Sequence, residues 1–402
     1  MKNTIKFMIG LLAIGLVSCE PEFENAVTDE GFYDAGDADF SNYVSLGNSL
    51  TAGYADGALY RSGQEDSYPN IMAEQFGFVG GGDFTQPLTS DNLGGLLLGG
   101  QQILGNRLVL SADENGNPFP TPLDGTPTTD VTTSATGPFN NMGVPGAKSY
   151  HLVTPGYGSV AGVANGTANP WYARFATSES STVLADAASL NPTFFSLWIG
   201  NNDILGYATS GGSGVDQTGN LDPSTYGGND ITDPNVFAAA YSAQVDALVA
   251  GGAKGVLLNI PDVTSIPYFT TVPPRSIPLD AATAGAVNAQ FALYNGALGQ
   301  LVAGGFISPE EAAIRAINFV EGVNYPIMTD VDLTDVTAIL IGAGLDSETA
   351  ALLGQLRQVK SDDLVVLTAS SALGSVPDPS NPLGIVGVSI PLSNQFVLTS
   401  TE

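Results

Sequence analysis

The chain of 402 residues carries 11 Lys and Arg against 40 Asp and Glu, a formal net charge of −29 at pH 7. A surface this acidic repels nucleic acid and anionic lipid, which argues against a polyanion as substrate or partner. The single cysteine excludes an internal disulfide and a cysteine-based metal or redox site, and we expect neither a metal nor a cofactor.

The first 18 residues have the features of a secretory signal peptide. Lys2 and Lys6 give a positive start, and the apolar stretch from Phe7 to Val17 is too short to span a bilayer. The only cysteine follows at Cys19, where Leu16-Val17-Ser18-Cys19 resembles the lipobox of bacterial lipoproteins. The resemblance implies that Cys19 is acylated, for example with palmitate, and becomes the new N-terminus. A lipid on Cys19 would then anchor the exported protein to a membrane.

Residues 19–40 form an acidic stretch without the periodicity of a helix or a strand, and we interpret them as a tether. An acidic stretch directly after the lipid-bearing cysteine resembles the surface-export signals of some Gram-negative lipoproteins. We therefore expect a location at the outer membrane or cell surface. The folded domain is expected to occupy residues 41–402.

From residue 40 onward, apolar runs typical of strands alternate with segments that have the spacing of helices. The predicted strands lie at 43–46, 193–199, 255–260 and 363–368. The predicted helices lie at 67–76, 233–250 and 280–302, with a further helix that begins at Ser308. Residues 80–138 are rich in Gly, Thr, Pro and Asp and predict a long excursion with one hairpin near 107–111. This alternation predicts an α/β fold with a parallel sheet covered on both faces, in one domain with insertions.

Three glycine-containing segments accompany predicted strands, namely Gly47-Asn48-Ser49-Leu50, residues 141–147 and Gly200-Asn201-Asn202-Asp203. An acyl-transfer enzyme needs a hydroxyl nucleophile and hydrogen-bond donors aimed at the oxyanion that forms on the carbonyl. Ser49 would supply the hydroxyl. The backbone amides of Ser49 and Gly146 and the side-chain amide of Asn202 would supply three donors. The alternative is that Ser49 only caps a helix.

In order and in strand context, these segments resemble the first three blocks of the SGNH, or GDSL, hydrolases. Asn48 stands where that family has Asp, and Gly200, Asn202 and Asp203 match its Gly-x-Asn-Asp block. The resemblance implies a three-layer, flavodoxin-like fold and an esterase or lipase with Ser49 as its catalytic nucleophile. It also implies an oxyanion hole made by Ser49, Gly146 and Asn202. The resemblance covers residues 43 to 260.

The family's last block, Asp-x-x-His, supplies the general base and has no counterpart in this sequence. The chain has one histidine, His151, and three explanations compete. In the first, the domain is truncated before that block, because Thr399-Ser400-Thr401-Glu402 has the pattern of a capping box that begins a helix. In the second, His151 replaces the missing base, although a histidine between Tyr150 and Leu152 is more often structural. In the third, the protein is a degenerate hydrolase that only binds its ligand.

We therefore expect a serine ester hydrolase that acts through an acyl-serine intermediate on an acylated glycan or lipid outside the cytoplasm. The loops at 80–138 and 205–231 would select the substrate. The alternative class is a non-catalytic surface lipoprotein that binds a ligand on the same fold.

Overall fold

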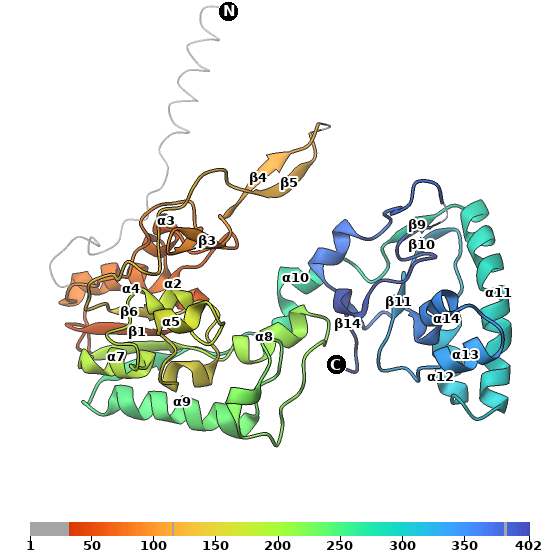
Figure 1. Ribbon diagram of the computed structural model, residues 1–402. Coiled ribbons are helices and arrows are strands. Elements are labelled where there is room, and N and C mark those ends of the chain that lie inside the picture. The colour runs from red at the N-terminus through yellow and green to blue at the C-terminus, as the bar shows by residue number, and fades with distance from the viewer. Residues whose placement is uncertain (1–31, 115, 382–383) are drawn as a thin grey trace, which may run out of the picture.

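The computed structural model describes residues 32–114, 116–381 and 384–402 (Figure 1). The predicted signal peptide at 1–18, the lipidation of Cys19 and the tether up to residue 31 lie outside the described residues. In the described part of the tether, Phe40 stacks on Phe76 with ring centroids 4.0 Å apart. Within the described ranges, no helix has the length and apolar character needed to cross a bilayer.

The first lobe is built on a parallel four-stranded sheet with the order β6-β1-β7-β8. The strands are β1 (Tyr43–Gly47), β6 (Asn141–Gly143), β7 (Phe194–Trp198) and β8 (Lys254–Leu257). In the register of the sheet, Gly47 at the end of β1 pairs with Gly143 of β6 on one side and with Trp198 of β7 on the other. The chain is thus a mixed α/β protein with a parallel sheet, as predicted, and the segments that follow β6, β1 and β7 leave the sheet at the same edge.

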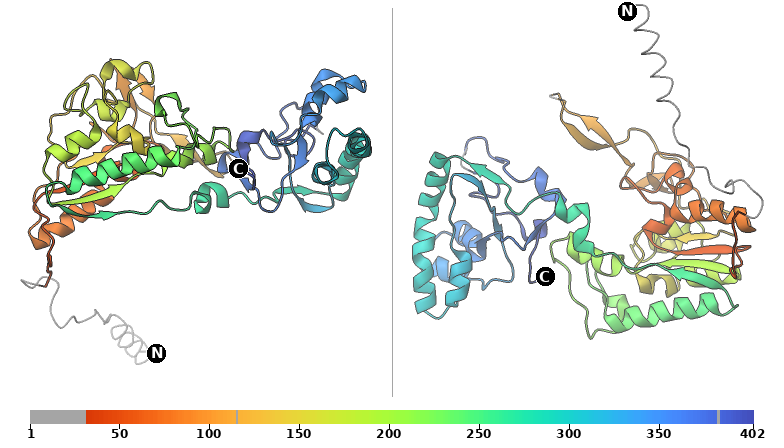
Figure 2. Two further views of the ribbon diagram at one scale, coloured as in Figure 1. Left: turned by 90° about the horizontal axis from the view of Figure 1, so that it is seen from below. Right: turned by 180° about the vertical axis from the view of Figure 1, so that it is seen from behind.

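Helices flank this sheet (Figures 1 and 2). Contacts join the short α2 (Ser49–Ala52) to β1 and β6, and α4 (Tyr68–Phe76) lies next to α2. Contacts join α7 (Val183–Ser189) to β1 and to α9 (Pro234–Val249), which runs along the other side. The buried residues of β1 and β7, which include Val44, Leu46, Phe195 and Leu197, form one core with the inner faces of α7 and α9. Strands buried in this way appear in the sequence as continuous apolar runs, which is why β1 and β7 were predicted.

The remaining short elements of this lobe lie in its loops. Its helices are α3 (Arg61–Glu65), η1 (Gly77–Val79), η2 (Ser149–Val153), α5 (Val160–Val163), α6 (Pro170–Ala173), α8 (Asn202–Thr209) and η3 (Pro223–Thr225). Its two hairpins pair β2 (Leu96–Leu98) with β3 (Gln101–Leu104), and β4 (Leu108–Ala112) with β5 (Pro118–Pro122). The β4–β5 hairpin projects from the lobe (Figure 1) and confirms the predicted hairpin near 107–111, whereas β2–β3 was not predicted.

From Val263 onward the chain builds a second lobe with its own hydrophobic clusters (Figure 1). Its helices are α10 (Pro267–Thr270), α11 (Ala281–Ala303), α12 (Pro309–Arg315), α13 (Thr337–Gly342) and α14 (Ser347–Gly354), with the short turns η4 (Val263–Ser265), η5 (Leu367–Ser371) and η6 (Asn394–Phe396). Its strands form antiparallel pairs, which are β9 (Ile277–Leu279) with β10 (Gly322–Asn324), β11 (Ile327–Thr329) with β12 (Leu356–Gln358), and β13 (Leu364–Val365) with β14 (Val397–Leu398). The strand predicted at 363–368 is therefore shorter than expected, because a 3-10 turn begins at Leu367.

The two lobes meet at the end of α8. Ala208 is buried in a cluster with residues of the second lobe, and Asn394 Nδ2 donates a 2.8 Å hydrogen bond to the carbonyl of Gly211. The predicted capping box is present nearby, because Thr399 N donates to Glu402 Oε2 at 2.8 Å and Glu402 N donates to Thr399 Oγ1 at 3.3 Å.

Candidate functional site

Two glycines allow α2 to pack directly on the end of the sheet. A Cβ atom added to Gly47 would lie 2.2 Å from Thr51 Oγ1, and one added to Gly143 would lie 2.3 Å from the backbone nitrogen of Ala52. Neither distance is possible for a real side chain, so β1 and β6 must both carry glycine where α2 crosses them. The chain consequently turns from β1 into α2 within a single residue, Asn48.

Ser49 is the first residue of α2, and Asn48 is the residue that caps the helix. The side-chain oxygen of Asn48 accepts a 3.1 Å hydrogen bond from the backbone nitrogen of Leu50. The alternative interpretation of Ser49 as the helix cap is therefore wrong. The Ser49 side chain is half-buried, and its hydroxyl has no hydrogen-bond partner among the residues that the structure describes. Its backbone N–H has no acceptor within the helix, because a helix leaves its first amides unpaired.

The segment after β6 carries Gly146, which has a φ of +80°. The peptide unit that joins Pro145 to Gly146 is held by Asn169, whose Nδ2 donates a 2.8 Å hydrogen bond to the carbonyl oxygen of Pro145. In a planar trans peptide, the carbonyl and the N–H point in opposite directions. Fixing the Pro145 carbonyl therefore also fixes the direction of the Gly146 N–H, which is the predicted oxyanion donor.

Asn169 was not predicted as a site residue. Its Oδ1 accepts hydrogen bonds from the backbone nitrogens of Trp171 and Tyr172 and so caps α6, and its Nδ2 also donates to the hydroxyl of Tyr157 at 3.1 Å. The sequence Asn169-Pro170 is a typical start of a helix, so the cap could have been found from the sequence. The bond to Pro145 spans 24 residues and has no local signal.

Asn202 and Asp203, at the start of α8, tie the third segment to the second. Asn202 Nδ2 donates a 2.9 Å hydrogen bond to the carbonyl oxygen of Ala147. A side-chain amide has two hydrogens, so one N–H of Asn202 remains for a ligand. The carboxylate of Asp203 accepts hydrogen bonds from the backbone nitrogen and the hydroxyl of Ser149, at 2.8 and 2.7 Å. Burial raises the pKa of this carboxyl group, and Asp203 is best understood as a structural clamp.

The structure thus brings the three predicted segments to one edge of the sheet. Ser49 follows the strand that lies between β6 and β7, and Asn202 contacts the segment that contains Gly146. Two buried polar atoms beside them, Asn48 Nδ2 and Asn201 Oδ1, have no hydrogen-bond partner in the described part of the chain. Unpaired polar atoms are rare in protein interiors, and five further buried side-chain atoms of this kind lie elsewhere in the described residues, so these two do not by themselves mark a site.

His151 lies in a packed environment on η2. Its Nδ1 accepts a 3.0 Å hydrogen bond from the backbone nitrogen of Lys148, and its ring stacks on Tyr157 with centroids 4.5 Å apart. Burial, with a contribution from the charge of Lys148, lowers the pKa of His151 to about 4. The neutral ring then carries its proton on Nε2, and its basic nitrogen is already occupied. This arrangement leaves no nitrogen free to accept the proton of a serine.

Two cavities are lined in part by residues of α6, and neither lining includes Ser49, Gly146 or Asn202. One, of about 210 Å³, is lined by Tyr54, which follows α2, by Leu104 and Leu108 of the hairpin region, and by Trp171. The other, of about 600 Å³, has a more polar lining. Its lining residues include Tyr150, His151, Tyr157, Asn169, Asp222 and Tyr226. Within the residues that the structure describes, no group of His, Cys, Asp and Glu side chains is arranged to hold a metal ion.

No protein-family model, curated protein or solved structure matches the chain. The α/β class and the geometry of the strand ends come from the structure itself.

Proposed function

We propose that the protein is a serine ester hydrolase of the SGNH type, an exported lipoprotein anchored to the membrane through Cys19. The observation that carries this proposal is the position of Ser49, at the end of β1 between the segment of Gly146 and the start of α8 with Asn202. The strand order β6-β1-β7-β8 is the order of the first four strands in flavodoxin-like folds, which supports a three-layer sandwich of that type.

The proposed reaction proceeds through an acyl-serine intermediate. Ser49 Oγ attacks the ester carbonyl, a general base takes its proton, and the alcohol leaves with that proton. The N–H groups of Ser49 and Gly146 and the free N–H of Asn202 stabilise the oxyanion that forms on the carbonyl oxygen. Water then attacks the acyl-serine, releases a carboxylic acid and restores the Ser49 hydroxyl.

The general base is proposed to come from polypeptide outside the described residues. His151, the one histidine of the chain, has its acceptor nitrogen occupied. The edge strand β8 supports the proposal that further polypeptide packs on this lobe. Among the described strands β8 pairs only with β7, and all four of its residues are exposed. Val256 and Leu257 are 41% and 50% exposed, so this edge offers apolar surface to a further strand.

We infer the substrate class from the two cavities that α6 helps to line. The smaller one is lined by leucine and aromatic side chains and fits the acyl group of an ester. The larger one offers tyrosine rings, an amide and a carboxylate, which suits the polar alcohol part of an acylated glycan or lipid. The second candidate function is ligand binding without catalysis, and the packed state of His151 is the observation that favours it.

The decisive experiment uses the natural full-length protein and measures the release of p-nitrophenol from p-nitrophenyl acetate and butyrate. We expect Ser49→Ala to abolish turnover, while Ser90→Ala, at an exposed serine in the same lobe, leaves it unchanged. A fluorophosphonate should modify Ser49, as detected by mass spectrometry of peptides. Equal rates for wild type and Ser49→Ala would refute the nucleophile assignment. Substrate binding without any turnover would favour the non-catalytic alternative.

The 402-residue chain provides a second measurement, and we expect it to be nearly inactive. Rapid hydrolysis by this chain would place the base within it and contradict the proposed external base.

A further inference from the structure

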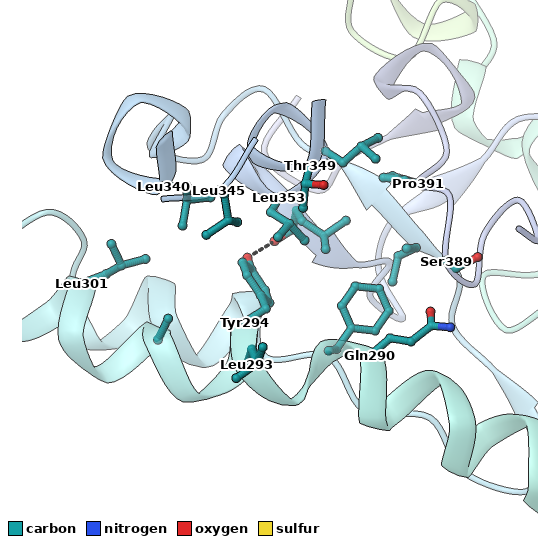
Figure 3. Close-up of a pocket in the computed structure, with 15 residues that line it drawn as sticks. Gln290, Leu293, Tyr294, Leu301, Leu340, Leu345, Thr349, Leu353, Ser389 and Pro391 are labelled. Carbon is teal, nitrogen blue, oxygen red and sulfur yellow. Dashed lines mark hydrogen bonds between the residues drawn. The ribbon is translucent and has the colours of Figure 1, made fainter. Parts of the chain in front are cut away.

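The second lobe contains an apolar cavity of about 350 Å³ between α11 and the pair formed by α13 and α14 (Figure 3). Its floor is α11, and its other walls come from α13, α14, the strand residues Ile327 and Leu356, and the segment 389–391. The lining contains aliphatic side chains on all of these walls, among them Ala297, Leu301, Leu340 and Leu353. The cavity lies in a different lobe from Ser49, so the inference below does not depend on the proposed hydrolase function.

The lining carries no charge, and its polar groups are few. The hydroxyl of Tyr294 donates a 3.1 Å hydrogen bond to the carbonyl oxygen of Leu356, so this buried polar atom is already satisfied. Gln290 and Ser389 lie together at one end of the cavity, whereas Leu301, Leu340 and Leu345 lie at the other end (Figure 3). The hydroxyl of Ser389 accepts a 3.1 Å hydrogen bond from the backbone nitrogen of Ile385, whereas the amide of Gln290 is exposed and can bind a polar group. The other end of the cavity can bind only an apolar group.

Large aliphatic side chains that line the cavity are also exposed to solvent. Leu293 on α11 is 88% exposed and Leu352 on α14 is 43% exposed. Both leucines line the same cavity, and contiguous exposed apolar surface commonly marks a binding site.

The size and chemistry of the cavity exclude a polypeptide as its occupant. A helix is about 10 Å across with its side chains, and even two turns need more volume than this cavity contains. An extended peptide would bring backbone N–H and C=O groups into a lining that offers them almost no partners, at a large desolvation cost. A hydrocarbon chain has no such requirement.

We propose that this cavity binds the unbranched hydrocarbon chain of an uncharged lipid or fatty alcohol, with its polar head beside Gln290 and Ser389. No Lys or Arg lines the cavity, and the chain has a net charge of −29, so a carboxylate head would be repelled. A methylene group is similar in size to a water molecule, which occupies roughly 30 Å³. The cavity volume of about 350 Å³ therefore accommodates a chain of about a dozen carbons.

The test uses the 402-residue chain and a fluorescent uncharged probe, 1-aminoanthracene, that n-alkanols displace. We expect the affinity of the alkanols to rise about fourfold with each added methylene from hexanol to dodecanol, as the burial of hydrocarbon requires. Decanoate should bind at least tenfold more weakly than decanol. Equal affinities of decanol and decanoate would overturn the uncharged head group.

Two variants and one control variant test whether the probe binds in this cavity. Ala297→Trp fills the floor of the cavity and should weaken decanol binding at least tenfold, while Ala292→Trp, on an exposed position of the same helix outside the lining, should leave it unchanged. Leu293→Gln changes an almost fully exposed side chain, so it cannot unfold the lobe, and it should weaken binding several-fold. Unchanged affinity in both Ala297→Trp and Leu293→Gln would overturn the proposal.

The oligomeric state, measured by sedimentation velocity, gives a separate test. Loss of probe binding when dimers form would assign the exposed leucines to a contact between two copies and would also overturn the proposal.

Discussion

The role of Asn169 can be tested by separating its two functions. Its Oδ1 caps α6, and its Nδ2 holds the carbonyl of Pro145 and thereby the direction of the Gly146 N–H. Asn169→Ala removes both. Loss of a helix cap costs about 1 kcal/mol, and a buried carbonyl left without its partner costs about 1–3 kcal/mol. We therefore expect Asn169→Ala to lower the free energy of unfolding by about 2–4 kcal/mol.

The matched control is Thr182→Ala. Thr182 caps α7 in the same lobe with a 3.0 Å hydrogen bond from the backbone nitrogen of Ala185 and has no second function of this kind. Its loss should cost about 1 kcal/mol. Asn169→Asp keeps the capping oxygen, removes the donor to Pro145 and places a carboxylate oxygen against the Pro145 carbonyl, so its cost arises at the second contact and should exceed that of the cap alone. Urea denaturation followed by circular dichroism measures all three variants.

Catalysis gives an independent readout of the same contact. If the Gly146 N–H stabilises the oxyanion, Asn169→Asp should lower kcat for p-nitrophenyl esters in the full-length protein by about 10²–10³, with little change in KM. Thr182→Ala should leave kcat unchanged. The reasoning is refuted if Asn169→Asp is as stable and as active as the Thr182→Ala control.

Three further predictions concern single residues. Asn202→Ala removes a proposed oxyanion donor and should lower kcat of the full-length protein about 10²–10³-fold, while the lost bond to Ala147 should cost only about 1 kcal/mol of stability by urea titration. Because the pKa of His151 in the folded chain, about 4, lies below the 6.5 of an exposed histidine, its contribution to stability is present above pH 6.5 and is lost as the pH falls toward 4. His151→Asn keeps an acceptor for the backbone amide but does not titrate. When the pH is lowered from 7 to 5, the free energy of unfolding of the wild type should therefore fall by about 2 kcal/mol more than that of the variant. The esterase activity of the full-length protein should persist in the variant. Arg357→Leu removes the guanidinium that bridges the buried carboxylates of Asp330 and Asp363 and should destabilise the chain by about 3–5 kcal/mol in the same titration, whereas a loss below 1 kcal/mol would show that the pair is not desolvated.

The sheet could be predicted where its strands are continuous apolar runs, in the buried β1 and β7 and also in β8, whose four residues are exposed. The apolar runs at 43–46 and 193–199 correspond to β1 and β7, and the capping signal at Asp233 and Pro234 correctly placed the start of α9. In contrast, β6 is three residues long and begins with a polar Asn141. Its side chain donates to the carbonyl of Thr51 at 2.9 Å and accepts from the nitrogen of Gly143, and these long-range bonds leave no periodic pattern.

The second lobe could be predicted only as separate helices. Its strands are two or three residues long, and such short strands are formed by contacts that the local sequence does not specify. Arg315 and Arg357 illustrate the problem, because both are almost completely buried. A sequence pattern places charged residues at the surface. Only the structure shows that Arg315 pairs with Glu311 and that Arg357 bridges two aspartates.

The structure brings the three predicted segments together at the carboxyl ends of the strands, whereas the roles of the residues that support them were not predicted. Glycines at strand ends indicated where the backbone must come close to a neighbouring element, and the structure shows α2 packed there. The cap of α2 is Asn48 and not Ser49, since either residue type can cap a helix and the sequence does not decide between them. The function of Asn169 depends on the orientation of a distant peptide plane, which no spacing rule encodes.

The distribution of charge is consistent with an enzyme that turns a neutral ester into a carboxylate. Four of the basic side chains are buried, namely Lys148, Arg174, Arg315 and Arg357, and so contribute little to the surface. Lys148 donates its Nζ hydrogens to the carbonyls of Gly227 and Asp230, with burial lowering its pKa. Six aspartates are buried as well, namely Asp186, Asp203, Asp230, Asp233, Asp330 and Asp363, so the surface remains strongly acidic, as the composition indicates. An uncharged ester approaches such a surface without penalty, whereas the carboxylate product is repelled by it. Because this repulsion is screened by salt, product inhibition by a carboxylate should be weakest at low ionic strength and should increase as salt is added.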